Sequence, residues 1–219
     1  VSTGNELVSI GSVPQTGKVR DSNPVLLRCI VERNGGVWAG NRRARDTDRD
    51  IVDKVIRFGG ADLVVVTGGS GPGRADLVKA ALAREGLQME FDGVAMRPGR
   101  TAAFGILGST PILLFPGTPH AVFVCGEVFL APVLRKMSGR RDLERPVVSA
   151  RLTAPMRRHQ AEVRFRPACV VRRGGGHRVT PVSALRTLRR VHTINGILVV
   201  PPGEGLMPMG SAVEVELLY

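Results

Sequence analysis

A glycine-rich loop follows a short apolar run in the first third of the chain. The segment TGGSGPGRAD, residues 67–76, comes directly after Leu63 to Val66. Glycines let backbone N–H groups converge on an anion, and the first turn of a following helix adds partial positive charge. We interpret the loop as an anion site with Asp76 behind it; the alternative is an ordinary strand-to-helix turn capped by Asp76. The expected contact residues are Thr67, Gly68, Gly69, Ser70, Gly71 and Gly73.

Two common glycine motifs are excluded by the residues around this loop. No Gly-Lys-Ser/Thr follows it, as a Walker A loop requires. Pro72 stands where a nucleophile elbow has its last glycine. The loop therefore indicates neither a P-loop nucleotide site nor a serine hydrolase.

Three further loops are expected at the same edge of one sheet. MRPGRT, residues 96–101, offers Arg97 and Arg100 on either side of a Pro-Gly turn, a geometry suited to oxyanions. FPGTPH, residues 115–120, follows an apolar run, and STGNEL, residues 2–7, brings the carboxylate of Glu6. Taken alone, each segment is also compatible with an ordinary turn, isolated arginines such as Arg97 and Arg100 are more often solvated charges than ligands, and Glu6 alone is compatible with a surface charge.

The elements that position these loops alternate between apolar runs and amphipathic segments. Helices are expected after the cap at residues 21–24 to about Arg33, from the cap at Thr47 onward, over residues 75–85, and over residues 120–137. Short apolar strands are expected over residues 63–67 and 112–115, as in a parallel sheet covered on both faces. We predict a three-layer, doubly wound α/β/α domain over residues 1–145. After it, alternating runs such as AEVRF and SAVEVELL predict a small all-β, barrel-like domain over residues 146–219.

The net charge of +12 lies in one part of the chain. Residues 135–190 hold sixteen Lys or Arg and three acidic residues. A basic block of this kind binds nucleic acid in some proteins, but this one has a single aromatic residue, Phe165, and no recognition motif. A solvated face is our default interpretation, with a small anionic ligand as an alternative, and we expect no nucleic-acid partner.

Composition favours a soluble, cytoplasmic protein. The longest apolar stretch, residues 121–134, is interrupted by Glu127, so no membrane span is expected. Three widely spaced cysteines form no CxxC pair and indicate free thiols, and none of the four histidines has a metal-ligand spacing. The chain opens at Val1 without a signal-peptide pattern or an initiator Met, and we expect it to be a fragment.

Several motifs together resemble the molybdopterin molybdenumtransferases of the MoeA/gephyrin type. In order, they are STGNELV, GKVRDSN, ADLVVVTGGSGPGRADLVKAAL, MRPGRTAAFG, LLFPGTPHAVFVCGEVFLAPVLRKMSG and NGILVVPPGEGLMPMGSAVEVEL. The resemblance covers nearly the whole chain. It implies the MogA-like α/β domain followed by the C-terminal barrel-like domain of that family, whose two N-terminal domains and much of whose homodimer contact lie outside this chain.

The resemblance also implies an activity and a set of residues. The activity is Mg²⁺-dependent insertion of molybdate into adenylylated molybdopterin, with release of AMP. Asp76, Glu6 and Asp46 match acidic positions of the family, and the first two would hold Mg²⁺, which prefers carboxylate and phosphate oxygens. Arg97 and Arg100 match the lysines of K-P-G-K-P. The substrate loop L-P-G-N-P corresponds to Pro116, Gly117, Thr118 and Pro119.

Departures from the family pattern leave two alternatives open. Gly68 to Gly73 is closer to the glycine loop of MogA-type adenylyltransferases, which act on molybdopterin and ATP. Both motif lysines are arginines, whose planar fork is not equivalent to an ammonium at a tight oxyanion site. The alternatives are therefore a MogA-like adenylyltransferase and a non-catalytic molybdopterin-binding module.

Overall fold

Two sets of contacts divide the chain into two units. The computed structural model describes residues 1–68, 75–182 and 192–218, and of residues 75 and 76 the backbone alone. The first unit comprises residues 1–94 and 99–139, and the second comprises residues 95–98 and 140–219. The chain thus leaves the first unit at Val94, returns at Gly99 and leaves it again after Gly139. The domain boundary at residue 145 stays our prediction.

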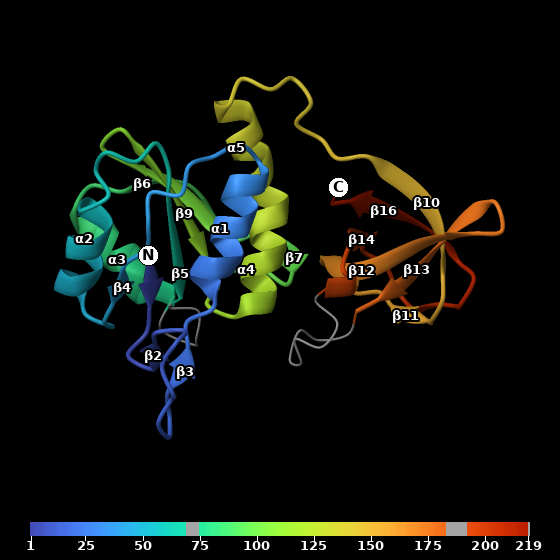
Figure 1. Ribbon diagram of the computed structural model, residues 1–219, viewed down its shortest axis with the longest axis horizontal. Coiled ribbons are helices and arrows are strands. Elements are labelled where there is room, and N and C mark those ends of the chain that lie inside the picture. Colours follow the sequence, from blue (N-terminus) through green and yellow to red (C-terminus); the bar gives the residue numbers. More distant parts are fainter. Residues whose placement is uncertain (69–74, 183–191, 219) are drawn as a thin grey trace. The chain divides into compact units, whose positions relative to one another are not determined.

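The first unit is a sheet covered by helices (Figure 1). Its elements are β1 (Ser2–Thr3), β2 (Leu7–Val8), β3 (Val19–Arg20), α1 (Asn23–Arg33), β4 (Arg43–Ala44), α2 (Asp48–Ile56), β5 (Val64–Gly68), α3 (Ala75–Arg84), β6 (Gln88–Asp92), β8 (Ala103–Leu107), β9 (Thr110–Phe115), α4 (Pro119–Cys125), the π-helical turn η1 (Gly126–Leu130) and α5 (Ala131–Met137). The sheet order is β4-β1-β5-β9-β8-β6.

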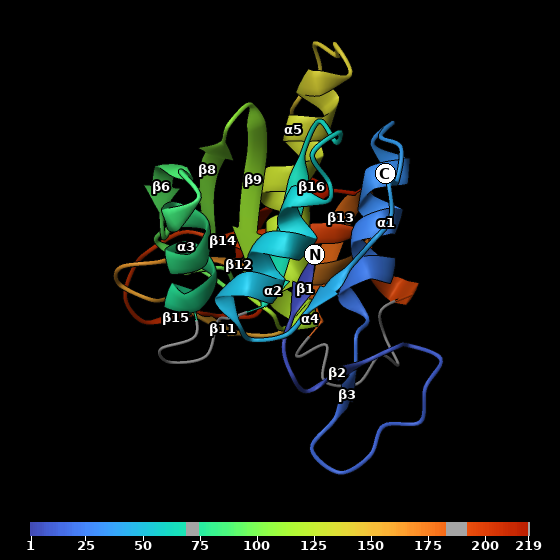
Figure 2. The ribbon, with the colours of Figure 1, turned by 90° about the vertical axis from the view of Figure 1, so that its left-hand side faces the viewer.

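The alternation of side chains along β9 explains why helices cover both faces of this sheet. Ile112 and Leu114 pack with residues of α2 and α3, whereas Leu113 and Phe115 pack with residues of α1, α4 and α5. Successive residues of a strand point to opposite faces, so an all-apolar strand needs a cover on each side. The three-layer α/β/α arrangement follows (Figure 2).

The sheet differs in one respect from the expected parallel sheet. β1, β4, β5 and β9 run parallel, but β8 pairs antiparallel with both β9 and β6. The connection from β8 to β9 is a tight turn at Gly108, whose φ of +62° favours glycine. The sequence did not predict β8 or the edge strand β6, and β6 is mostly exposed and carries acidic residues, which are uncommon in strands.

Local sequence signals determine where α1 and α2 begin, as expected. The hydroxyl of Thr47 accepts a hydrogen bond from the backbone N–H of Asp50 and begins α2. Pro24 lies in the first turn of α1, where a missing N–H costs nothing. The long helix expected over residues 120–137 runs as α4, η1 and α5. The π-helical turn ends at Leu130, two residues before Pro132, which has no N–H to donate to a helical hydrogen bond.

The second unit contains a closed five-stranded barrel. Its strands are β7 (Met96–Arg97), β10 (Val147–Leu152), β11 (Met156–Arg157), β12 (Val163–Arg173), β13 (Gly176–Pro181), β14 (Gly196–Val200), β15 (Leu206–Met207) and β16 (Ala212–Leu217). The order β13-β10-β16-β14-β12 closes because β12 also pairs with β13, and β7 adds to β12. The predicted fold class, α/β followed by a small barrel-like domain, is confirmed.

No helix along the described residues combines the length and the apolar character needed to cross a membrane.

Cysteine reactivity tests the packing of α4 against the sheet. Burial raises the pKa of Cys125 to about 12, whereas Cys29 is exposed on α1. Because the thiolate is the reactive form, we expect a disulfide reagent at mildly alkaline pH to label Cys29 in the native chain and to leave Cys125 unlabelled. Mass spectrometry of the labelled peptides measures this, and unfolding in concentrated guanidinium chloride serves as the control. Equal labelling of the two native thiols would contradict the packing.

Candidate functional site

The loops that follow β1, β5 and β9 meet at Gly68. A Cβ atom at Gly68 would lie 2.3 Å from the carbonyl oxygen of Thr3, and its φ of +120° is one that residues with side chains rarely adopt. On the other side, a Cβ at Gly117 would lie 3.0 Å from the Cα of Gly68. Only glycine permits three parallel strand ends to approach so closely. Backbone from three loops therefore gathers at the carboxyl edge of the sheet, where α/β proteins bind ligands.

Asn23, at the start of α1, joins two of these loops. Its side-chain amide donates to the carbonyl of Gly117 at 2.8 Å and to the hydroxyl of Thr67 at 3.4 Å. Asn23 and Thr67 are buried, and the Asn23 Oδ1 and Thr3 Oγ1 atoms have no hydrogen-bond partner among the described residues. Buried polar atoms without partners are costly. This edge of the sheet consequently retains acceptors for donors that a ligand or water could supply.

The loop after β1 carries the carboxylate of Glu6 next to a second acidic residue. Both carboxylate oxygens of Glu6 lie 2.8 Å from the position that a Cβ atom of residue 4 would occupy. The Glu6 side chain therefore packs against the backbone of Gly4. Asn5 and Asp46 exchange two hydrogen bonds of 3.2 Å, each backbone N–H donating to the side-chain oxygen of the other residue. The structure thus brings Glu6 and Asp46 to adjacent loops, those after β1 and β4.

A basic pocket of about 780 Å³ adjoins these loops. Its lining includes Asn5 and four cationic residues, with Asp50 as the one acidic residue; the cations are Lys18, Arg43, Arg45 and Lys54. Lys18 donates to the carbonyl of Asn5 at 2.8 Å, and Arg43 donates to the carbonyl of Leu7 at 3.1 Å. An excess of positive charge in a concave surface raises the local concentration of anionic ligands.

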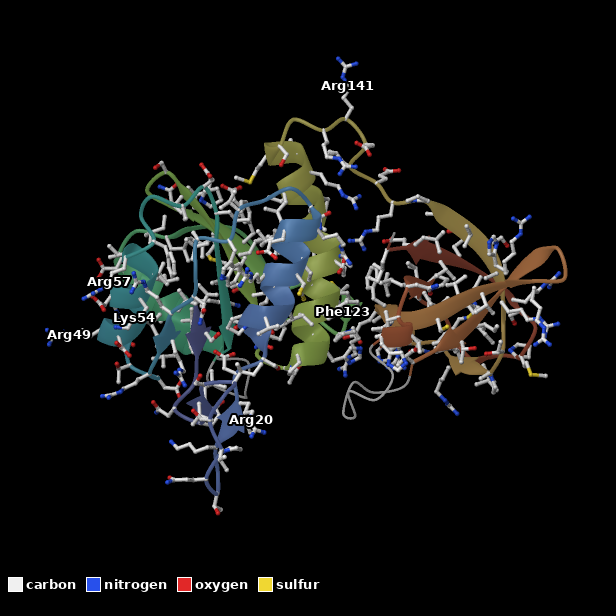
Figure 3. The ribbon with its side chains drawn as sticks, in the orientation of Figure 1. Arg20, Arg49, Lys54, Arg57, Phe123 and Arg141 are labelled. Carbon is white, nitrogen blue, oxygen red and sulfur yellow. The ribbon has the colours of Figure 1, made fainter. Side chains whose placement is uncertain are left out.

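Asp50 shapes the wall of this pocket. The backbone N–H of Arg45 donates to its carboxylate at 2.7 Å, and Lys54 lies 3.1 Å away on the same helix. These contacts, the backbone hydrogen bond first, lower the pKa of Asp50. One turn later, hydrogen bonds from Lys54 on α2 and then from Arg57 directly after it (Figure 3) lower the pKa of Asp53 to about 2. The anionic form of each carboxylate is therefore held in place by donors.

A second pocket, of about 590 Å³, lies at the amino end of the same sheet. Its lining is largely apolar and includes Trp38, Phe58 and Leu134, with Val64 at the start of β5. An apolar cavity does not match an anionic ligand. The two ends of the sheet therefore differ in chemistry, and the carboxyl end carries the candidate site.

The predicted site residues of the glycine loop and of residues 116–119 divide into three groups. Thr67, Gly68 and Gly117 come together as expected, with Pro116 buried beside them and Thr118 and Pro119 at the start of α4. Gly69, Ser70, Gly71 and Gly73 lie outside the described residues. Asp76 is the second residue of α3, and its side chain is outside the description as well.

The expectation for the loop at residues 96–101 is wrong in its topology. β7, which contains Arg97, pairs with β12 of the second unit and is not a strand of the first sheet. Arg97 donates to Glu162 at 2.6 Å, whereas Arg100 belongs to the first unit, where its carbonyl accepts from the backbone N–H of Val94. The short run MRP is compatible with a strand of either sheet. Only the strand with which it pairs shows to which sheet it belongs. Binding roles for Arg97 and Arg100 stay predictions.

The sequence did not predict the role of Asn23, whose side chain joins Thr67 to Gly117, or the basic pocket. The Asn-Pro pair at residues 23 and 24 marks a helix start directly before an apolar face. This pattern predicts the start of the helix, but it does not show that the Asn23 side chain reaches the neighbouring loops. Arg43 and Arg45 lie in NRRARD and gave no signal of convergence with Lys18 and Lys54, which are distant in sequence. Among the described residues, no group of three or more His, Cys, Asp or Glu side chains forms a metal site.

Comparisons with known proteins agree on one family. Residues 1–136 match the family model MoCF_biosynth, described as a probable molybdopterin binding domain. The chain is 31% identical over 221 residues to molybdopterin molybdenumtransferase 2 of Mycobacterium tuberculosis (strain CDC 1551 / Oshkosh), covering 98% of this chain and 55% of that protein. It is 24% identical to a molybdopterin molybdenumtransferase of Staphylococcus aureus (strain COL), covering 99% and 52%. The chain therefore spans about half the length of the curated relatives it matches.

Solved structures give the same fold. Two structures of a molybdopterin biosynthesis MoeA protein from Pyrococcus horikoshii align over 99% of this chain and 52% of theirs, with TM-scores of 0.82 and 0.72 and identities of 24% and 22%. The resemblance drawn from the motifs is confirmed.

Substitution of Gly68 tests the close approach of the loops. Gly68→Ala places a methyl group against the Thr3 carbonyl, and we expect it to destabilise the chain by about 1–3 kcal/mol more than Gly40→Ala. Gly40 is a matched control because its φ of +117° is similar and nothing lies within 4 Å of its Cβ position. Urea unfolding measures both free energies. Equal losses would mean that backbone strain alone, and not the contact, requires glycine at Gly68.

Proposed function

This chain belongs to the MoCF_biosynth family of probable molybdopterin binding domains, and from that premise we propose that it forms the pterin-binding part of a molybdopterin molybdenumtransferase. The proposed reaction is the insertion of molybdate into adenylylated molybdopterin, with release of AMP. It would be a step of molybdenum cofactor biosynthesis in the cytoplasm, carried out by a homodimer of the complete protein.

One observation carries this proposal: three parallel strand ends converge at Gly68 beside a basic pocket. Adenylylated molybdopterin and molybdate are both oxyanions, and converging backbone N–H groups with nearby cations recognise that class of ligand. The glycine loop from Thr67 to Gly73 would hold the substrate phosphates. The loop from Pro116 to Pro119 would hold molybdate beside them, with Arg100 as a further cation.

Carboxylates at the same edge suit a divalent cation. Mg²⁺ binds through one or two carboxylates and completes its coordination with water and phosphate oxygens. Glu6 lies on the loop after β1, and Asp76 is the second residue of the helix after the glycine loop, so these two residues would supply that donor set. Bound Mg²⁺ would offset the charge that develops on the phosphate when AMP leaves. Asp46, held by Asn5, would orient the loop that carries Glu6.

Asp76 is the residue whose substitution tests this function. Asp76→Asn keeps the shape of the side chain and removes its charge, so molybdate-dependent AMP release should fall by roughly 10- to 100-fold, the range typical of a lost group in a metal site. The assay supplies adenylylated molybdopterin and Mg²⁺ with and without molybdate. The assay is run with this chain and with the full-length natural protein that contains it.

The matched control is Asp62→Asn. Asp62 is exposed and lines the apolar pocket at the opposite end of the sheet, so turnover and melting temperature should stay unchanged. Unchanged turnover in Asp76→Asn would remove Asp76 from the reaction. Binding of molybdopterin without any AMP release from either protein would leave a binding module in place of an enzyme, and AMP transfer from ATP to molybdopterin would identify the adenylyltransferase.

A further inference from the structure

Asn23 stands at a helix start without serving the helix. It is the first residue of α1, and the side-chain oxygen of an asparagine at a helix start usually accepts from a free backbone N–H of the first turn. Here the Oδ1 atom has no partner among the described residues, and Ser22, at the N-cap position, makes no capping hydrogen bond. Asparagine is also a weak helix former. The helix therefore does not explain why an asparagine occupies this position.

The nitrogen of the same amide holds the loop after β9. It donates to the carbonyl of Gly117 at 2.8 Å, 94 residues further along the chain, and more weakly to the hydroxyl of Thr67 at 3.4 Å. Asn23 is only 5% exposed, so little water competes for these hydrogen bonds. The loop of residues 116–119 thus depends on a side chain of a distant element for one of its hydrogen bonds.

Two other asparagines show how a purely structural amide is satisfied. Asn34, at the end of α1, donates to a backbone carbonyl of its own helix at 2.7 Å and accepts from Arg135 at 3.0 Å. Asn195 accepts from the backbone N–H of Val170 and donates to the carbonyl of the same residue. Both use each end of the amide, whereas Asn23 uses its nitrogen alone. Because buried acceptors are rarely left unpaired, the oxygen of Asn23 indicates a donor that the described residues do not supply, such as a bound ligand or a water.

Movement of this loop would change the ligand edge of the sheet directly. A Cβ atom at Gly117 would lie 3.0 Å from the Cα of Gly68, so the loops after β5 and β9 already approach as closely as two backbones can. The loop leads into α4, where the backbone N–H of Val122 donates to the carbonyl of Thr118 at 3.0 Å. Strand β9 holds one end of the loop and α4 holds the other. The bond from Asn23 holds the turn between them.

We propose that Asn23 is a positioning residue, whose amide fixes the loop of residues 116–119 in the arrangement that binds the oxyanion substrate. This inference rests on the function proposed above, in which that loop holds molybdate. A loop that is fixed before the ligand arrives does not have to be ordered during binding, so its affinity is higher. The role requires an uncharged amide, because a carboxylate has no proton to donate to the Gly117 carbonyl and would repel it.

The test measures AMP release from adenylylated molybdopterin and Mg²⁺ over a range of molybdate concentrations, with this chain and with the full-length natural protein. Asn23→Asp keeps the shape of the side chain and removes its donors, so the KM for molybdate should rise about tenfold, the effect of losing one buried hydrogen bond. The kcat should change less, because the loop would contact molybdate in the ground state and in the transition state alike. A variant that only unfolds in part would lower kcat and leave this KM unchanged.

The matched control is Asn34→Asp. Asn34 is also buried, lies at the opposite end of α1 and likewise donates to a backbone carbonyl, so its substitution should lower the melting temperature without shifting the KM for molybdate. Asn23→Ala is a second variant for the case that the buried carboxylate of Asn23→Asp prevents folding. It removes the same hydrogen bond without adding a charge and should raise the KM similarly. An equal rise in Asn34→Asp, or an unchanged KM in both variants of Asn23, would overturn the proposal.

Amide hydrogen exchange of the full chain without ligand separates failure of this proposal from failure of the proposed function. The N–H groups of Gly117 and Thr118 should exchange about tenfold faster in the variants of Asn23 than in the natural chain, and at an unchanged rate in Asn34→Asp. Faster exchange, without AMP release from the natural protein, would reject the proposed function and support Asn23 as the residue that holds the loop. Unchanged exchange would overturn the positioning role whatever the AMP assay shows.

Discussion

The approach of three backbones at Gly68 is the constraint on which the candidate site depends. Parallel strands bring their carboxyl ends to one edge, but side chains normally keep the following loops apart. Here the Thr3 carbonyl occupies the space that a Cβ of Gly68 would need, and Gly117 approaches from the other side. Asn23 then fixes the loops after β5 and β9 with one amide group. Because Gly68 and Gly117 have no side chains, backbone dipoles from separate loops lie close enough together to act on one ligand.

The same edge is held in place by the double cover of the sheet. β9 alternates between a cluster with α2 and α3 and a cluster with α1, α4 and α5, so neither layer can slide without exposing apolar residues of that strand. The helices α2, α3 and α4 begin at this carboxyl edge because they follow β4, β5 and β9 of the parallel core. The first turn of α2, which Thr47 stabilises, borders the basic pocket through Asp50.

The sequence predicts the parts of this arrangement that local chemistry dictates. Thr47, Pro24 and the period of apolar residues determine where helices begin, and the apolar runs before Thr67 and Pro116 determine the central strands. Long-range pairing is less accessible. β7 is two residues long, and nothing within it distinguishes β12 from a strand of the first sheet as its partner. The proximity of Arg43 and Arg45 to Lys18 could not be predicted from the sequence for the same reason. Each of these charged residues, taken alone, resembles a solvated surface residue.

The excess of arginine in the second half of the chain serves more than one physical role. Arg140 pairs with Asp142 at an exposed position, and Arg151 donates to the carbonyl of Gly210, as expected of a solvated face. Arg164 and Arg166 differ because the pairing of β12 places them on the same face as the buried Val200 and Leu198, so that both are partly buried and water screens their mutual repulsion less. A bias toward arginine from composition alone would not select positions that face a core. The location of these two charges on the strand, and not their number, is what distinguishes them from the solvated arginines around them.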